Sequence, residues 1–202
     1  MKPPETIQTE RLTLRRLRME DAEAIFSSYA QDSEVTRFLT WRPHQRIDET
    51  QAFVQSRIKA WDESSEFTWA ILSNDGGLIG GIALRQGGFK VDFGYVIART
   101  YWGKGFAAEA LRPLVDWAMR QPEIFRAWAV CDEENSASAR VMEKVGMTRE
   151  GVLNKWMLHP QVGDTPRDCL CYSITKESYG QPTAPPYSEP TDTLVGKKKI
   201  ML

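Results

Sequence analysis

The chain has 202 residues, and its 26 Lys and Arg residues against 27 Asp and Glu residues give a formal net charge of -1. This balance excludes the wholesale neutralisation of nucleic-acid phosphates, so we expect no nucleic-acid partner. With 42% hydrophobic and 26% charged residues, the composition is that of an ordinary globular protein, and the length suits one domain, or one domain with a tail.

In chain order, the first half predicts a strand, two helices and an antiparallel meander. Alternating apolar residues predict a strand over residues 7–17, and apolar residues at helical spacing predict helices over about residues 20–30 and from Asp48 onward. Three strands separated by glycine-containing turns follow, at residues 67–72, 78–84 and 91–98.

The second half alternates helices and strands. A helix is expected over about residues 104–120, where Pro122 prevents its continuation, and a second over residues 136–145, which Gly146 ends. Strands are expected at residues 124–131, 147–158 and 168–175. This order predicts an α+β fold with a mixed, mostly antiparallel central sheet flanked by helices.

The C-terminal segment differs from the rest of the chain. It contains four of the 11 prolines and a run of three lysines at residues 197–199. Such a segment buries too little apolar surface to offset its ordering entropy. We therefore expect one domain over residues 1–178 and a flexible Pro-rich tail with a terminal Lys run over residues 179–202.

Other features point to a cytoplasmic protein. Residues 1–10 are polar, and no stretch approaches the ~20 apolar residues of a membrane span, so we expect no membrane partner. Cys131, Cys169 and Cys171 are an odd number and are interpreted as small buried side chains in a reducing compartment. The two histidines lack the clustered spacing of a zinc site, so no metal is expected.

The segment that carries most chemical information is Tyr-Trp-Gly-Lys-Gly-Phe-Ala at residues 101–107. Gly103 and Gly105 allow a tight turn and a close approach of the backbone to a ligand, and unpaired N–H groups at the following helix start attract an anion. The pattern lacks the hydroxyl of a Walker loop and the third glycine of a dinucleotide fingerprint. Glycines at such a junction can also serve the turn alone.

Four separated motifs occur in a fixed order along the chain. They are Thr-Glu-Arg-Leu-Thr-Leu-Arg at residues 9–15, Asp-Phe-Gly-Tyr-Val-Ile at 92–97, Trp-Gly-Lys-Gly-Phe-Ala at 102–107, and Asn-Ser-Ala-Ser at 135–138, which runs on to Lys-Val-Gly-Met at 144–147. Over about residues 7–178 this arrangement resembles the GNAT superfamily of N-acetyltransferases, and within it the RimJ/RimL branch. The resemblance implies a GNAT-like sheet with splayed central strands.

The resemblance also implies acetyl-CoA as the co-substrate, without a metal. It implies that the pyrophosphate lies on the backbone of Gly103, Lys104, Gly105, Phe106 and Ala107, with Arg99 as local help. The pantetheine arm would pair with the fourth predicted strand near Ile97. Trp102 stands where general GNAT loops carry Arg or Gln, a departure that is typical of the RimJ/RimL branch.

Two polar residues of the last motif are candidates for the cofactor arm. Asn135 and Ser138 lie three apart and therefore on one helix face. Asn135 is either a helix N-cap or, in addition, a hydrogen-bonding partner of the arm. Many GNAT relatives have a tyrosine acid seven residues beyond this asparagine, where this chain has Met142. Ser138, a water molecule or no group at all is then left to assist the departing thiolate.

Candidates on the acceptor side are fewer. Asp92 is either the general base or ammonium anchor, or a solvated strand carboxylate. Trp41 either borders the acceptor cleft or makes a core or dimer contact. The remaining tryptophans that we consider are interpreted mostly as core, namely Trp61, Trp69, Trp117, Trp128 and Trp156. Glu109 is interpreted as complementing the helix dipole.

These observations predict an acetyl-CoA-dependent N-acetyltransferase in which an amine attacks the acetyl group directly. The preferred acceptor is a protein N-terminal α-amine of the ribosomal-protein type, because the branch implies it. One alternative is acylation of a small amine, such as an aminoglycoside or polyamine. Another is a CoA-binding module without turnover. A homodimer is a possible assembly.

Overall fold

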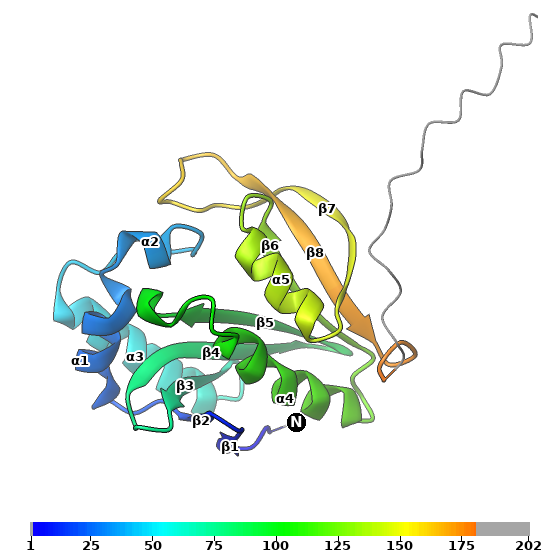
Figure 1. The fold of residues 1–202 in the computed structure, drawn as a ribbon, viewed down its shortest axis with the longest axis horizontal. Helices are drawn as coiled ribbons and strands as arrows, with labels where there is room; N and C mark the ends of the chain where they lie inside the picture. Colours follow the sequence, from blue (N-terminus) through cyan, green and yellow to red (C-terminus); the bar gives the residue numbers. More distant parts are fainter. Residues whose placement is uncertain (1, 181–202) are drawn as a thin grey trace, which may run out of the picture.

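In the computed structural model, residues 2–180 are described, and they form a single sheet with helices on both faces (Figure 1). Its strands, in the spatial order β1-β2-β3-β4-β5-β6-β8-β7, are β1 (Thr6–Gln8), β2 (Leu12–Arg16), β3 (Phe67–Ser73), β4 (Leu78–Gly87), β5 (Lys90–Ile97), β6 (Arg126–Asp132), β7 (Thr148–Met157) and β8 (Arg167–Thr175). The helices are α1 (Asp21–Ile25), continued by a π-helical turn (Phe26–Ala30), α2 (Ser33–Thr36), α3 (Ile47–Asp62), α4 (Phe106–Arg120) and α5 (Ser136–Lys144).

Adjacent strands in residues 2–180 pair antiparallel, except β5 and β6, which pair parallel. The predicted α+β class with a mixed, mostly antiparallel sheet is therefore confirmed. The parallel pair arises because the chain leaves β5, crosses one face of the sheet as α4, and returns as β6, the connection that a parallel pair requires.

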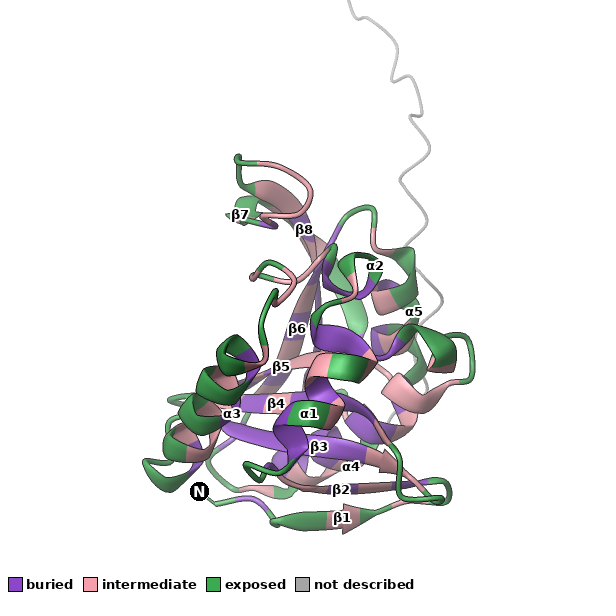
Figure 2. Cartoon of the chain, turned by 90° about the vertical axis from the view of Figure 1, so that its left-hand side faces the viewer, coloured by how far each residue is buried: buried purple, intermediate pink, exposed green. Residues whose placement is uncertain are grey.

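The sheet separates two apolar layers, which Figure 2 shows as buried strands between helices. On one face, Leu111 and Leu114 of α4 pack in a cluster with the sheet. On the other, Val54 of α3 and Ile25 of α1 pack against Ala70 of β3. Because β3 is covered on both faces, its residues 67–71 are all buried, and Thr68 is the one polar residue among them.

The single strand expected over residues 7–17 is wrong, because the segment forms the β1–β2 hairpin. The turn is closed by Thr9, whose backbone N–H donates to the carbonyl of Leu12 at 2.9 Å and whose Oγ1 accepts from the Leu12 N–H at 3.0 Å. Alternation continues through this turn and no Gly or Pro marks it, so the pattern could not reveal the reversal. Helix α2, N-capped by Asp32, was also not expected.

The tryptophans divide between the core and the surface. Trp61 and Trp69 are buried and lie edge to face, with ring centroids 4.9 Å apart, as expected of core residues. Trp156 is 49% exposed, so its assignment to the core is wrong. It lies on β7, at the edge of the sheet. Its ring packs edge to face with that of half-buried Trp128, with the ring centroids 6.4 Å apart. The cysteines are free and buried, as expected, at Cys131, Cys169 and Cys171.

Residues 181–202 of the expected tail lie outside the described residues. Tyr179, which the sequence analysis assigns to that tail, packs against the core and donates a hydrogen bond from its hydroxyl to Asp116 of α4 at 2.9 Å. The longest helix between residues 2 and 180 is α3, with 16 residues. In that part of the chain no helix has the length and apolar content to cross a membrane.

Two carboxylates at the ends of strands, Glu66 just before β3 and Asp132 at the end of β6, form hydrogen bonds with arginines from other parts of the chain. Glu66 accepts from Arg57 Nη1 at 2.7 Å, and Asp132 accepts from Arg167 Nε at 2.6 Å. Burial acts to raise the pKa of each carboxyl, but the hydrogen bonds and charges of the arginines, with further hydrogen bonds from Thr68 to Glu66 and from the backbone of Glu134 to Asp132, together outweigh it. The pKa of both groups therefore lies below its ordinary value.

We predict that these pairs make the protein sensitive to acid. Unfolded Glu and Asp bind protons near 4.5 and 3.8, whereas the folded carboxyls bind them only at lower pH. Their contribution to stability is complete above about pH 5 and is lost as the pH falls below about 4. Thermal unfolding followed by circular dichroism between about pH 3 and 7 measures this loss, which should be smaller in Glu66→Gln. A melting temperature that does not change across this range would contradict the prediction.

Candidate functional site

The central strands separate after a short paired region. β5 and β6 pair only through residues 90–92 and 126–128. Beyond them, β5 continues along β4 to Ile97, while β6 continues along β8 (Figure 1). Residues 93–97 therefore have no strand partner on the side of β6, and we call this opening the split. It confirms the expected splay of the central strands.

The loop that leads into α4 has the backbone of an anion cradle. Gly103 and Gly105 have φ angles of +75° and +83°, a conformation that side chains with a Cβ rarely adopt. Gly105 is the N-cap of α4, and no side chain caps the helix there. The first N–H groups of α4 are thus available to a ligand, and the dipole of this 15-residue helix favours an anion at that end.

The cradle is tied to the β1–β2 hairpin by Arg11, from the first sequence motif, and Glu109, in the first turn of α4. The Glu109 carboxylate accepts from Thr9 Oγ1 at 2.6 Å, from the Arg11 N–H at 2.8 Å and from Arg11 Nε at 2.7 Å. Arg11 Nη1 in turn donates to the Lys104 carbonyl at 3.1 Å, and its guanidinium lies 4.5 Å from the Phe106 ring centroid. We call these residues the hairpin clamp.

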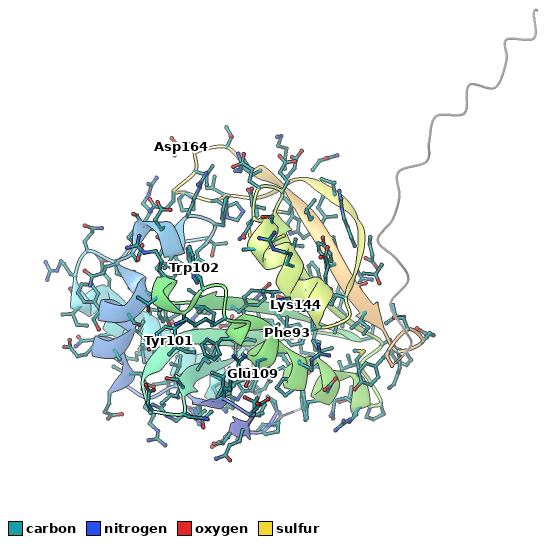
Figure 3. All side chains as sticks on the ribbon, in the orientation of Figure 1. Phe93, Tyr101, Trp102, Glu109, Lys144 and Asp164 are labelled. Atoms are coloured by element: carbon teal, nitrogen blue, oxygen red, sulfur yellow. The ribbon has the colours of Figure 1, made fainter. Side chains whose placement is uncertain are left out.

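The clamp also controls charge near the cradle. Burial acts to raise the pKa of Glu109, but the hydrogen bonds from Thr9 and Arg11 hold it below its ordinary value. The carboxylate therefore stays ionised and is compensated by Arg11, on the side of α4 that faces the hairpin (Figure 3). The sequence interpretation of Glu109 as a dipole partner did not include this pairing, because Arg11 is 98 residues away.

The two cations expected near the cradle have partners in the protein. Lys104 Nζ lies 5.1 Å from the centroid of the Tyr101 ring. Arg99 Nε lies 3.1 Å from the Asp32 carboxylate, which also caps α2. Lys104 is part of the loop itself, whereas Arg99 connects this region to α2.

Trp102 holds the end of β5 in a way that sequence reasoning missed. Its indole N–H donates to the Ile97 carbonyl at 2.7 Å, while 48% of the residue remains exposed. Ile97 itself is buried, so only its backbone meets the split. The unusual residue at position 102 was a signal in the sequence, but its bond to Ile97 depends on the path of the loop.

Across the split, α5 presents the two polar residues of the fourth motif. The Asn135 side chain accepts from the Ser138 N–H at 3.1 Å, which is an N-cap. The Ser138 Oγ lies 2.7 Å from the hydroxyl of Tyr95, a residue of β5 and of the second motif whose role the sequence did not indicate. Tyr95 and Ile97 share the face of the sheet that carries α4 and α5, since they are two residues apart.

Asp92 lies on the opposite face of β5. Its carboxylate ion-pairs with Arg85 of β4, with Nη2 and Oδ2 2.5 Å apart. It also lies at the last residue pair before the strands separate, opposite Trp128. The structure therefore places Ser138 and Ile97 on the same face of the sheet, on opposite walls of the split. Asp92 lies at the closed end of the split, on the other face.

On that second face, the segment after α2 meets the loop between β7 and β8. His159 Nδ1 lies 3.4 Å from the Leu39 carbonyl, and Arg42 lies 3.8 Å from Asp164 at the tip of the loop (Figure 3). Trp41, in the same segment, is half-buried, and its ring centroid lies 4.8 Å from that of His44. The sequence contained no periodic signal that joins these loops.

Beneath this contact, the end of β6 carries a polar cluster. The Asp132 carboxylate is completely buried, and it binds Arg167 and lies 3.6 Å from His159 Nε2. Within residues 2–180, no three His, Cys, Asp or Glu side chains are grouped so that they could hold a metal ion.

Comparison with known proteins identifies relatives along most of the chain. Residues 11–148 match the acetyltransferase (GNAT) domain. The uncharacterized N-acetyltransferase YoaA of Bacillus subtilis is 33% identical over 84% of this chain and 96% of its own length. The crystal structure of a GNAT-family acetyltransferase from Bacillus anthracis is 30% identical, with a TM-score of 0.74 over 85% of this chain and 99% of that one.

A third similarity concerns the fold alone. RimL, described as a ribosomal L7/L12 alpha-N-protein acetyltransferase and solved in complex with coenzyme A, is 20% identical to this chain. It superimposes with a TM-score of 0.75 over 85% of this chain and 98% of its own.

We predict that Glu109→Gln loosens the cradle. The amide cannot satisfy the three donors of Thr9 and Arg11, so the free energy of unfolding should fall by about 1–3 kcal/mol. Hydrogen exchange of the backbone N–H groups of residues 103–107 should become faster. Urea unfolding and hydrogen-exchange mass spectrometry measure these effects. The control is Glu63→Gln, which removes an exposed carboxylate at the end of α3. Equal exchange in both variants would show that the clamp does not hold the loop.

Proposed function

The chain belongs to the GNAT acetyltransferase family and is an N-acetyltransferase, and we propose that it transfers acetyl groups from acetyl-CoA to protein N-terminal α-amines. The observation that carries this proposal is the open cradle of residues 103–107 beside the split between β5 and β6. We also place the chain within the RimJ/RimL-like branch of the family.

In this proposal, the pyrophosphate of acetyl-CoA binds the backbone of the cradle, from Gly103 to Ala107. The fit depends on Gly105, where the left-handed backbone is required and where an added Cβ would lie 3.7 Å from Arg11 Nη2. The pantetheine arm then enters the split and pairs with the free edge of β5 up to Ile97. Asn135 of α5 hydrogen-bonds the arm from the opposite wall, in addition to its role as an N-cap.

The pairing of carboxylates with arginines supports an α-amine acceptor rather than a polyamine. Four carboxylates at α2, at the end of β6, in the turn before α5 and in the β7–β8 loop each pair with an arginine, at Asp32–Arg99, Asp132–Arg167, Glu134–Arg37 and Asp164–Arg42. Paired in this way, these four carboxylates leave little net negative charge for a polycation. A protein N-terminus carries one charge with a pKa of about 7.7–8.0, so part of it is already neutral at pH 7. RimL, which has the same fold, is described as acting on such an amine.

The chemistry proposed for the site is direct attack of the neutral amine on the thioester carbonyl. Backbone N–H groups at the open edge of β5 stabilise the oxyanion. Asp92 anchors the ammonium or accepts its proton, and Trp41 borders the acceptor path. Ser138 assists the departing thiolate, whose conjugate thiol has a pKa of about 8.5.

Release of free CoA from acetyl-CoA tests this function. The purified protein is incubated with peptides that have a free α-amine, with the same peptides blocked at the α-amine but containing lysine, and with spermidine and aminoglycosides. Turnover with the free α-amine alone supports the proposal. Preference for the small amines would support the second interpretation, and saturable CoA binding without any turnover would support a binding module.

We predict that Gly105→Val weakens binding of CoA by about tenfold or more, because the strained loop moves its N–H groups off the pyrophosphate. Isothermal titration with CoA measures the affinity. A matched control is Gly76→Val, because Gly76 has a φ of +84° against +83° at Gly105 and lies in the β3–β4 turn, away from the cradle. Both variants lose stability by the same backbone strain, about 1–2 kcal/mol. If both bind CoA like the wild type, the cradle is misplaced.

We predict that Asp92→Asn lowers kcat/KM by about 10²-fold, the range of a lost proton acceptor. The pH profile should also move upward, toward the amine's own pKa of about 7.7–8.0, because attack then depends on the amine that is neutral in solution. The control is Asp62→Asn, which removes the exposed carboxylate of α3 that pairs with Arg16 of β2. An unchanged profile in Asp92→Asn would remove Asp92 from the mechanism.

A further inference from the structure

Tyr95 reaches across the split from one wall to the other. It lies on β5, three residues beyond the last pair with β6, and its hydroxyl reaches the first turn of α5. There it lies 2.7 Å from Ser138 Oγ and 3.1 Å from the Ser138 carbonyl oxygen. A chain that enters the split along β5 must pass this pair of hydroxyls.

The pair has one proton more than its mutual hydrogen bond uses. Tyr95 and Ser138 each carry one O–H group, and only one of the two protons can lie between the two oxygens. When Tyr95 donates to Ser138 Oγ, the serine proton is free to point at a group in the split. When Ser138 donates instead, the Tyr95 proton is available, at present to the Ser138 carbonyl.

No hydroxyl of α5 occupies the position that the family pattern gives to a tyrosine acid. That position holds Met142, whose side chain is buried and carries no proton to donate. Cys131 of β6 is buried and is a titratable group next to the pair. Burial raises the pKa of this thiol to about 12, so it stays neutral and does not repel an anion in the split.

We propose that Tyr95, together with Ser138, donates the hydrogen bond that stabilises the CoA thiolate as it leaves. This inference rests on the proposed function, since it assumes that the pantetheine arm lies in the split. In the step, the bond from the amine nitrogen to the acetyl carbon forms and the carbon–sulfur bond breaks. The electron pair stays on sulfur, the amine proton passes to a base or water, and both hydroxyls keep their own protons.

The environment of Tyr95 suits a donor rather than an acid that ionises. Burial raises the pKa of the phenol above its ordinary value. Full transfer of its proton to a thiolate with a pKa of about 8.5 would therefore be unfavourable. A hydrogen bond to an anion is about twice as strong as one between neutral groups, so the pair favours the thiolate over the neutral thioester.

Binding of CoA provides a test that does not depend on the acceptor. CoA and desulfo-CoA, in which hydrogen replaces the thiol, are titrated by calorimetry at about pH 7 and pH 9, below and above the ordinary thiol pKa of about 8.5. In the wild type, the preference for CoA over desulfo-CoA should rise by about tenfold between the two pH values, because the thiolate accepts the stronger hydrogen bond. In Tyr95→Phe this rise should become smaller, and in Tyr95→Phe/Ser138→Ala, where neither hydroxyl is left, it should disappear.

A matched control removes another hydroxyl that joins the sheet to the same helix. Tyr172 of β8 donates to Glu143 of α5 at 3.0 Å, away from the split. Tyr172→Phe should keep the wild-type rise in preference for CoA. If Tyr95→Phe keeps it too, or if Tyr172→Phe loses it equally, the proposal is overturned. If the wild type binds neither ligand, the proposed function itself fails, and this outcome is distinct from the others.

Turnover gives a second readout. Tyr95→Phe should lower kcat by about 10- to 100-fold, while the affinity for desulfo-CoA stays within about twofold of the wild type. The double variant Tyr95→Phe/Ser138→Ala should lose more kcat than the single variant, because Ser138 alone still has a proton to donate. Equal losses in kcat and in desulfo-CoA affinity would show that Tyr95 only shapes the split, and would overturn the proposal.

Discussion

The parallel contact between β5 and β6 is the constraint on which the rest of the structure depends. It is limited to residues 90–92 and 126–128, because β5 stays with β4 while β6 turns along β8. Beyond this point, the backbone N–H and C=O groups on the facing edges of β5 and β6 have no hydrogen bonds to each other and need other partners. The Ile97 carbonyl finds one in the indole N–H of Trp102. The short pairing thus creates both the opening in the sheet and the free backbone that lines it.

Contacts on each face of the sheet hold the opening in shape. On one face, the hairpin clamp holds the cradle at the start of α4, and Tyr95 and Tyr172 tie β5 and β8 to α5. On the other face, Leu39 and Arg42 meet the loop that carries His159 and Asp164. The split therefore lies between a face that carries the loop of residues 103–107 and a face on which Asp92 and Asp132 are each paired with an arginine.

Periodicity and turn chemistry predicted much of this fold. The amphipathic spacing around Leu111 and Leu114 identified α4, and the glycine-containing turns identified the β3–β4–β5 meander. The predictions failed where the signal was not local. The β1–β2 turn contains no Gly or Pro, and the exposure of Trp156 depends on the position of β7 at the sheet edge. The alternation of residues along one strand reveals neither the order of the strands in the sheet nor which helices pack on each face.

The sequence by itself determined most of the elements, the backbone of the loop at residues 103–107 and the family, because these depend on residues that are neighbours along the chain. Gly103 and Gly105 specify the backbone of the cradle wherever the loop lies. Tertiary structure alone decided which groups meet. It brought Arg11 to Glu109 across 98 residues and Tyr95 to Ser138 across 43. The physical reason is that hydrogen-bond partners are selected by distances of about 3 Å in space, and the packing of helices on a twisted sheet sets those distances.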